Sequence, residues 1–232
     1  MNNPELLKTS IDDISYLDYR NILNVSSGTL IRNDGHSESN LLNFIANHCR
    51  EENGLSTSRL IRINQKHTGH VISASQDLAR PADGIYTKSK NDILIIKTAD
   101  CLPLLITDGH TAGLLHLGWR SILAGIIGNF FRTVPDFNRA NARAAVGPAI
   151  RAGCFEVSPE VALLFDERYR IKIDGKYHVD LEEIVIDELS RNEVNYIYKS
   201  EACTFCQPQK YYSYRREGDD VGHMFSFICL GG

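Results

Sequence analysis

The sequence has no long apolar run, which argues against a membrane-spanning helix. No segment approaches the roughly 20 consecutive apolar residues that a helix needs to cross a bilayer. Residues 1–5, Met-Asn-Asn-Pro-Glu, have neither the basic start nor the apolar stretch of a secretory signal peptide. We therefore expect a cytoplasmic protein with no membrane partner.

Positive charge is also scarce. The formal net charge is −4 and the sequence pI is about 6.1, with lysines and arginines scattered along the chain. A nucleic-acid-binding surface normally needs a basic patch or stripe, and none is present. Small molecules are therefore the expected partners, nucleic acid is not, and the sequence indicates no oligomeric state.

Cysteines are too few and too dispersed for a disulfide scaffold. The six lie at positions 49, 101, 154, 203, 206 and 229, which favours free thiols or metal ligands in a reducing compartment. Cys203-Thr-Phe-Cys206 is half of a zinc knuckle or a redox pair, but a second such motif is absent. A loop near the functional site is the simpler interpretation of this motif.

The chain contains no repeat, low-complexity segment or linker. A single domain spanning 1–232 is therefore expected, with an α+β fold of helices packed on antiparallel or mixed strands. The predicted helices cover 40–52, 120–133, 158–165 and 180–191. The predicted strands include 19–25, 59–64, 144–149, 194–198, 211–216 and 224–230, with turn chemistry at 26–29.

Two stretches at the centre of the chain bring polar chemistry to the ends of buried strands. Apolar, β-branched runs in 92–107 are interrupted by Asp100-Cys101, and the run 112–117 carries His116 just before Gly118. Asp108-Gly109 is a hairpin signal between the two stretches. A rigid scaffold of this kind can hold a reaction centre.

His67, Cys101 and His116 are the strongest candidate site residues. Catalytic zinc sites use three protein ligands and leave one position open, and two histidines with one thiolate fit that pattern. The same set matches blue copper. Two other interpretations stay open: Cys101 as a nucleophile with His116 as its base, and both residues as ordinary core side chains.

A set of motifs in this sequence resembles the YfiH (PgeF) family, which is also filed as multicopper polyphenol oxidoreductase (laccase). The motifs are Gln65-x-His67 with Gly69 and Val71, Ala82-Asp83-Gly84, Thr98-Ala-Asp-Cys-Leu-Pro103, His116-Leu-Gly-Trp-Arg120, Val146-Gly-Pro148, Cys203-Thr-Phe-Cys206 and Tyr212-Ser-Tyr-Arg-Arg-Glu-Gly218. The resemblance covers roughly residues 59–230, and residues 1–58 match only weakly.

This resemblance implies a four-layer α/β/β/α sandwich of mixed sheets and one zinc ion held by His67, Cys101 and His116. The implied activity is purine nucleoside phosphorolysis with adenosine deamination, acting on adenosine, inosine, guanosine and methylthioadenosine. Arg120 and Arg215 lie in matching motifs and are expected to bind phosphate. Gln65 is expected to orient the substrate, and Asp100 to orient a ligand, act as an acid or base, or cap a strand end.

The sequence departs from the family pattern where Ser121, Ala149 and His223 replace a glycine, a cysteine and an arginine. Two alternative functions therefore remain beside the zinc enzyme. One is a copper-dependent phenol oxidase, although eight histidines without a His-x-His pair are sparse for several coppers. The other is a cysteine hydrolase that edits peptidoglycan precursors, with Cys101 as the nucleophile.

Overall fold

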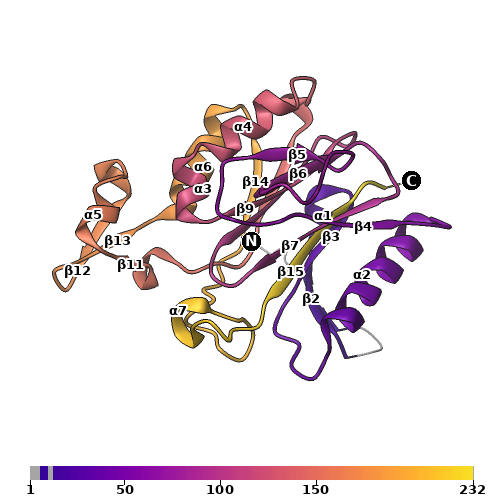
Figure 1. Cartoon of the computed structure of the whole chain (residues 1–232). Coiled ribbons are helices and arrows are strands. Elements are labelled where there is room, and N and C mark those ends of the chain that lie inside the picture. Colours follow the sequence, from indigo (N-terminus) through magenta and orange to yellow (C-terminus); the bar gives the residue numbers. More distant parts are fainter. Residues whose placement is uncertain (1–5, 10–12, 232) are drawn as a thin grey trace.

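The computed structural model describes residues 6–9 and 13–231, and two six-stranded sheets dominate it (Figure 1). The first sheet has the strand order β1 (Leu6–Thr9), β2 (Ser15–Asp18), β3 (Ser26–Leu30), β15 (Met224–Cys229), β7 (Asp92–Thr98) and β4 (Arg59–Arg62). The second has the order β14 (Tyr196–Lys199), β10 (Arg143–Val146), β8 (Leu102–Thr107), β9 (Ala112–Leu117), β6 (Gly84–Thr87) and β5 (Val71–Ser73). Both sheets are mixed, because β4–β7, β5–β6 and β10–β14 are parallel pairs.

The helices are α1 (Arg20–Leu23), α2 (Glu38–Asn53), α3 (Trp119–Leu123), α4 (Ile126–Thr133), α5 (Pro159–Ala162), α6 (Leu181–Arg191) and α7 (Tyr214–Glu217). Of these, α2 packs on the outer face of the first sheet, and α4 and α6 pack on the outer face of the second. Among the described segments, none of them combines the length and apolar character that a bilayer crossing requires.

Three apolar clusters define the layers. One lies between the sheets and includes Leu94 of β7 and Leu114 of β9. A second joins the first sheet to α2 through Ile45, and a third joins the second sheet to α4 and α6 through residues such as Phe130 and Val185. The predicted α/β/β/α sandwich is confirmed, and each fully buried side chain of this size contributes roughly 1.5–3 kcal/mol.

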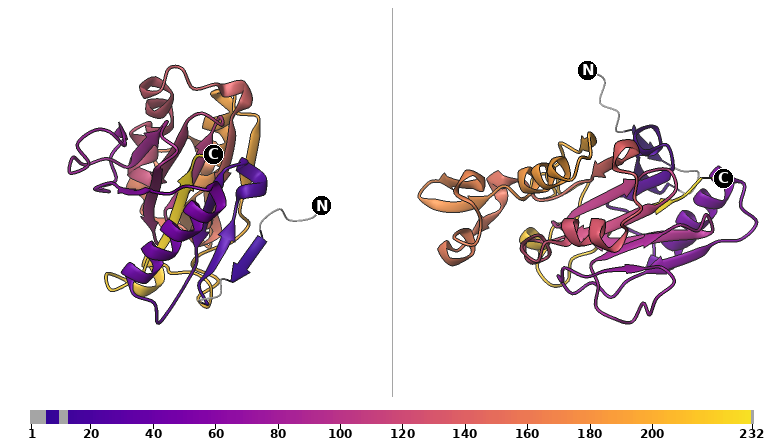
Figure 2. Two further views of the ribbon diagram at one scale, coloured as in Figure 1. Left: turned by 90° about the vertical axis from the view of Figure 1, so that its right-hand side faces the viewer. Right: turned by 90° about the horizontal axis from the view of Figure 1, so that it is seen from above.

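A small third sheet forms an arm that projects from the sandwich. Its strands are β11 (Glu156–Val157), β13 (Lys176–Val179) and β12 (Arg170–Ile173), in that order, and α5 lies within the same segment (Figures 1 and 2). The hairpin strands of this arm were not anticipated from the sequence, since their apolar residues alternate over only four positions each.

Four stretches depart from the predicted secondary structure. Residues 20–23 form α1 and not part of a strand, and 26–30, expected as a turn, form the buried strand β3. Residues 214–217 form α7 where a strand was predicted. The predicted helix 120–133 is two helices, α3 and α4, because Gly125 adopts a left-handed conformation with φ of 69°.

The chain crosses between the two large sheets three times at one end of the sandwich. The crossovers are residues 63–70 from β4 to β5, residues 99–101 from β7 to β8, and residues 200–223 from β14 to β15. Strand pairing places them together: Leu102 pairs with Leu117, and Met224 pairs with Thr98. This end of the molecule therefore collects residues that are far apart in the sequence.

Candidate active site

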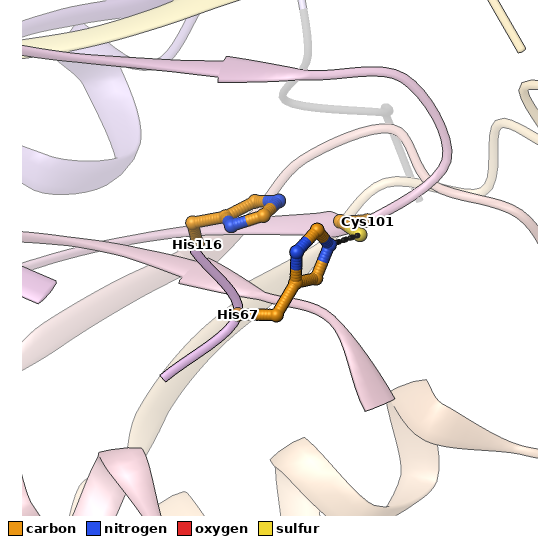
Figure 3. A group of neighbouring side chains, drawn as sticks. All are labelled: His67, Cys101 and His116. Atoms are coloured by element: carbon orange, nitrogen blue, oxygen red, sulfur yellow. Dashed lines mark hydrogen bonds between the residues drawn. The ribbon is translucent and has the colours of Figure 1, made fainter. Parts of the chain in front are cut away.

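His67, Cys101 and His116 converge at this end. His67 lies on the first crossover, Cys101 on the second, and His116 near the end of β9, and Figure 3 shows their side chains gathered around one point. One ligand atom from each lies within 4.8 Å of the others, and His67 Nε2 is 3.8 Å from Cys101 Sγ. The structure thus brings together all three residues that the sequence singled out.

Asp83 holds both histidines in position. Its Oδ1 is 2.8 Å from His116 Nδ1, which leaves Nε2 of that ring for the site. Its Oδ2 accepts hydrogen bonds from the backbone N–H groups of Lys66 and Thr68, on either side of His67. A carboxylate behind a histidine ligand fixes the orientation of the ring and raises its basicity. His67 itself has a φ of 57°, a strained conformation that this anchoring maintains.

Gly118 leaves the space that the His67 ring occupies. A Cβ at position 118 would lie 2.6 Å from His67 Cδ2 and 3.1 Å from Cys101 Sγ, so any larger residue would push the imidazole away. This space and the donor set of two imidazoles and one thiol fit zinc or copper(I). The residues present therefore suit a metal ion with one coordination position left open.

Electrostatics favour the ionised thiol. Burial raises the pKa of Cys101, but the charge and hydrogen bonds of His116 and His67 outweigh burial and bring it to about 6. Burial likewise lowers the pKa of His116, while the Cys101 thiolate and Asp83 raise it to about 9. For Asp83, burial raises the pKa, and hydrogen bonds from His116 and Thr68 lower it to about 2. A thiolate is the form of cysteine that binds metals.

The trio opens into a cavity of about 650 Å³. Its lining contains every residue that the sequence assigned to the site, and several more: Arg62, Ile63, Asn64, Gln65, His67, Lys97, Ala99, Asp100, Cys101, His116, Trp119, Arg120, Ile150, Phe155, Tyr214, Arg215, Val221 and His223. A cavity of this size accommodates a small organic ligand.

The two arginines predicted to bind phosphate contribute positive charge to the cavity. Arg120 stacks on the ring of Trp119, with its Cζ 4.1 Å from the ring centroid. Arg215 reaches the carbonyl of Cys154 at 3.5 Å and lies near the ring of Phe155. Within the described residues neither guanidinium forms an ion pair with a carboxylate, so both can bind an anion.

Gln65 and Asp100 are already engaged with the protein. The Gln65 side chain exchanges two hydrogen bonds with the backbone of Lys97, at 2.8 and 2.9 Å, and so extends the pairing of β4 with β7. Asp100 accepts hydrogen bonds from the hydroxyls of Thr204 and Ser213 and from the N–H of Arg215. Asp100 therefore positions the third crossover, and with it Arg215, against the cavity.

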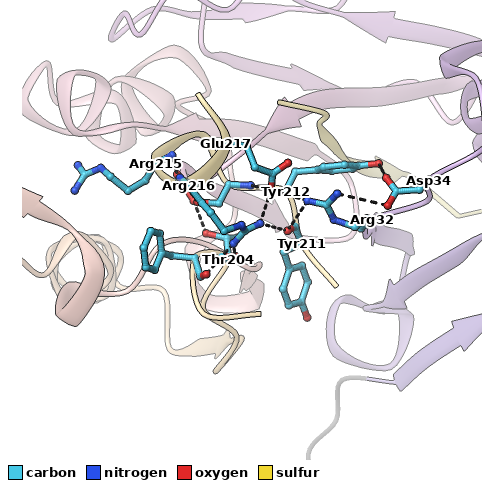
Figure 4. A network of polar contacts seen from close by, with 11 residues as sticks. Arg32, Asp34, Thr204, Tyr211, Tyr212, Arg215, Arg216 and Glu217 are labelled. Carbon is cyan, nitrogen blue, oxygen red and sulfur yellow. Dashed lines mark hydrogen bonds and ion pairs between the residues drawn. The ribbon is translucent and has the colours of Figure 1, made fainter. Parts of the chain in front are cut away.

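The third crossover is fixed by a polar network (Figure 4). Arg216 donates to the carbonyls of Thr204 and Phe205, each at 2.7 Å, and pairs with Glu217 at 2.5 Å. Glu217 also pairs with Arg32 from the segment after β3. The loop that carries Arg215 and His223 is consequently held at both sheets.

Sequence reasoning missed the role of Asp83. The residue was noted only as part of a motif, because no spacing rule connects positions 67, 83 and 116. Its signal was a carboxylate placed directly before the buried strand β6, where an acidic side chain has little reason to be buried unless it is paired. His223 also lines the cavity and was noted only as a departure from the family pattern.

Comparisons with known proteins identify the family of this chain and several relatives. The family model described as multi-copper polyphenol oxidoreductase laccase matches residues 33–231. A purine nucleoside phosphorylase from Haemophilus influenzae is 32% identical over 185 residues, covering 72% of this chain and 73% of that protein. Purine nucleoside phosphorylase YfiH from Escherichia coli is 30% identical over 183 residues, covering 75% and 74%.

Two solved structures share the fold. YfiH from Bacillus licheniformis superposes with a TM-score of 0.79 at 24% identity, covering 95% of this chain and 98% of that one. YlmD from Geobacillus stearothermophilus also gives 0.79, at 22% identity, covering 99% and 100%. At these identities the likeness establishes the fold alone.

Proposed function

Since this chain belongs to the YfiH family, whose model is described as multi-copper polyphenol oxidoreductase laccase, we propose that it is a metal-dependent purine nucleoside phosphorylase. The proposed metal is zinc, held by His67, Cys101 and His116. The proposed substrates are adenosine, inosine, guanosine and methylthioadenosine with phosphate, and the site would also deaminate adenosine. The observation that carries the proposal is one cavity that joins this trio to two arginines, neither of which pairs with a carboxylate of the described residues.

Phosphate binding falls to Arg120 and Arg215. Two guanidinium groups without carboxylate partners can hold a phosphate by charge-assisted hydrogen bonds. A phosphate oxygen so held would attack C1′ of the ribose, the bond from C1′ to the purine nitrogen would break, and ribose 1-phosphate and the free base would form. The Arg120 guanidinium stacks on the Trp119 ring and is held in place by it. Arg120 therefore needs little reorganisation to bind phosphate.

Aromatic side chains offer a surface for the purine ring. Trp119, Phe155 and Tyr214 line the same cavity as the arginines, and a flat base can stack on such rings. Bound zinc would supply Lewis-acid polarisation of an oxygen in the substrate or in water. In deamination, water would add at C6 of adenosine and ammonia would leave. Asp83 supports either reaction by keeping His116 oriented.

The first experiment measures metal content and phosphate-dependent release of hypoxanthine from inosine. Wild-type protein should retain zinc in this site, and Cys101→Ser should lose both that zinc and turnover, because one of three ligands is gone. Cys49→Ala, which removes a buried sulfur of α2 that does not line the cavity, should change neither. Full turnover by Cys101→Ser would disprove the zinc proposal.

Phosphate recognition needs its own variant. Arg120→Met should raise the KM for phosphate by a factor of about 10 or more, since a charge-assisted hydrogen bond contributes roughly 1.5–3 kcal/mol. The KM for inosine should change less. Arg59→Met, which removes an exposed arginine outside the cavity, is the control. Equal effects on both substrates would indicate a general disturbance and not a phosphate site.

A cysteine hydrolase remains a second candidate because the Cys101 thiol lies beside two imidazoles and favours ionisation. Iodoacetamide distinguishes a nucleophile from a ligand. If Cys101 is a metal ligand, the metal-free protein will be alkylated there and the zinc-loaded protein will be protected. Alkylation that proceeds equally in zinc-loaded protein and abolishes activity would favour the hydrolase.

A further inference from the structure

A second group of thiols lies apart from His67, Cys101 and His116. Cys154, Cys203 and Cys206 place their sulfur atoms within 4.8 Å of one another, and Cys154 Sγ is 3.3 Å from Cys206 Sγ. All three are free cysteines. Cys154 ends a short 3-10 helix at 152–154, and the other two lie on the third crossover. Segments that are about 50 residues apart in the sequence therefore meet here.

The backbone around Cys203 is arranged for a negatively charged sulfur. Ala149 and Cys203 form an isolated parallel bridge, and the N–H of Thr204 donates to the carbonyl of Ala149 at 3.1 Å. The backbone N–H groups of Arg151 and Cys206 donate hydrogen bonds to the sulfur of Cys203. A donor three residues after the first cysteine of a Cys-x-x-Cys turn stabilises a thiolate ligand.

The spacing of the sulfurs suits one shared ion better than a disulfide. A disulfide would join two of the three at about 2.05 Å and leave the third thiol unused. Sulfurs that bind one zinc at about 2.3 Å lie about 3.7–4 Å apart, within the range seen here. Within the described residues the group offers three ligands. The bound ion would therefore either be three-coordinate or take a water molecule as its fourth ligand.

Neighbouring arginines donate hydrogen bonds to backbone carbonyls in and beside both cysteine segments. Arg216 donates to the carbonyls of Thr204 and Phe205, inside the Cys-x-x-Cys turn, and Arg215 donates to the carbonyl of Cys154 (Figure 4). Arg151 donates to the carbonyl of Ala202 at 3.1 Å. Cationic side chains thus fix the backbone of both cysteine segments.

We propose that Cys154, Cys203 and Cys206 form a second metal site, which binds a thiophilic closed-shell cation of the zinc and copper(I) class. Thiolate-rich donor sets select such ions. The bound ion would tie the start of the arm, which carries Phe155, to the crossover that carries Arg215. Both residues line the cavity, so the second ion would hold one wall of the candidate active site in place.

Cadmium titration of fully reduced protein tests this site directly. Cadmium bound by thiolates absorbs in the ultraviolet, and the intensity follows the number of sulfur ligands. Cys101→Ser should show a three-sulfur signal, and wild-type protein should show the same signal together with that of the Cys101 thiolate. Cys206→Ser should bind at this site more than about 100-fold more weakly, because loss of even an outer supporting group costs roughly 10–100-fold. Cys206 is exposed, so this variant should fold.

The controls separate the two sites and the competing explanation. Cys154→Ser should repeat the loss seen with Cys206→Ser, whereas Cys49→Ala should bind cadmium as wild-type does. The proposal is overturned if Cys206→Ser and wild-type give the same titration, or if Cys101→Ser shows no thiolate signal. It is also overturned if the reduced protein binds no cadmium here and forms only a Cys154–Cys206 disulfide in air.

Discussion

Asp83 shows how much one side chain can organise at the residue scale. One oxygen orients His116, and the other accepts hydrogen bonds from the backbone on both sides of His67. The two imidazoles therefore depend on the same carboxylate, although His67 lies on the first crossover and His116 on β9. Sequence patterns identified the three candidate ligands from residue type and family resemblance. They could not identify their common support, because that relation exists only after folding.

Replacing this carboxylate should weaken metal binding without unfolding the protein. Asp83→Asn keeps the shape but loses the charge, and loss of such a supporting group costs roughly 10–100-fold in metal affinity or activity. Competition with a zinc chelator measures the effect. Asp92→Asn is the matched control: Asp92 is also buried and hydrogen-bonded, to Thr87 and Arg59, but lies outside the cavity. Equal zinc affinity in both variants would contradict the assigned role of Asp83.

The space left by Gly118 gives a second prediction at this scale. In Gly118→Ala the new methyl group would collide with the His67 ring, so the protein should lose metal and turnover while it remains folded. Gly128→Ala in α4 is the control, because its new Cβ meets nothing closer than 3.5 Å. That change should stabilise the helix by up to about 1 kcal/mol. Metal analysis of both variants measures the loss of the ion, and circular dichroism shows whether each variant remains folded.

At the scale of elements, the errors of sequence prediction have physical causes. Strand β3 contains Ser26-Ser-Gly-Thr, which is typical of a turn, yet it lies between β2 and β15. Gly28 is needed there because a Cβ would lie 2.6 Å from the carbonyl of Leu17. Tertiary pairing overrides local propensity in such a strand. The aromatic alternation at 211–214 suggested a strand, but hydrogen bonds to Asp100 bend this segment into α7.

Helix α3 contains a buried hydroxyl that destabilises the folded protein. Ser121 is fully buried, and its hydroxyl has no hydrogen-bond partner within the described residues. Ser121→Ala should therefore stabilise the protein by about 1 kcal/mol, the lower end of the penalty for an unpaired buried group. Ser226→Ala is the contrasting change, because Ser226 bonds to Thr29 in the core and its loss should destabilise. Urea unfolding of both variants should give shifts of opposite sign.

At the scale of the whole molecule, the layered fold was predictable because buried strands and amphipathic helices leave strong patterns. The outer helical layer on the second sheet depends on a cluster of three phenylalanines, whose centroids lie 5.2–5.7 Å apart. The position of the arm was not predictable, since its short strands and exposed Leu163 and Leu164 carry little periodicity. The crossovers between the two sheets could not be predicted either, because the order of strands in the sequence does not indicate which sheet each strand joins.

Cooperative stability should reside in these layers and not in the arm. Phe130→Ala should cost about 3–5 kcal/mol, as expected for a fully buried aromatic residue. Leu164→Ala, on the exposed side of the arm, should stay within about 0.5 kcal/mol of wild-type. Thermal unfolding of the two variants tests the difference. Comparable losses would mean that the arm is part of the cooperative unit.

The tip of the arm has a practical consequence for protein engineering. Ile173 pairs with Lys176 across a two-residue loop, in which Asp174 and Gly175 have φ of 50° and 79°. Neither residue lines the cavity of the candidate active site, and exposed loop tips of this kind accept foreign sequence well. A fluorescent reporter domain spliced between these two residues should leave the candidate active site undisturbed, so the folded protein could be followed in living cells.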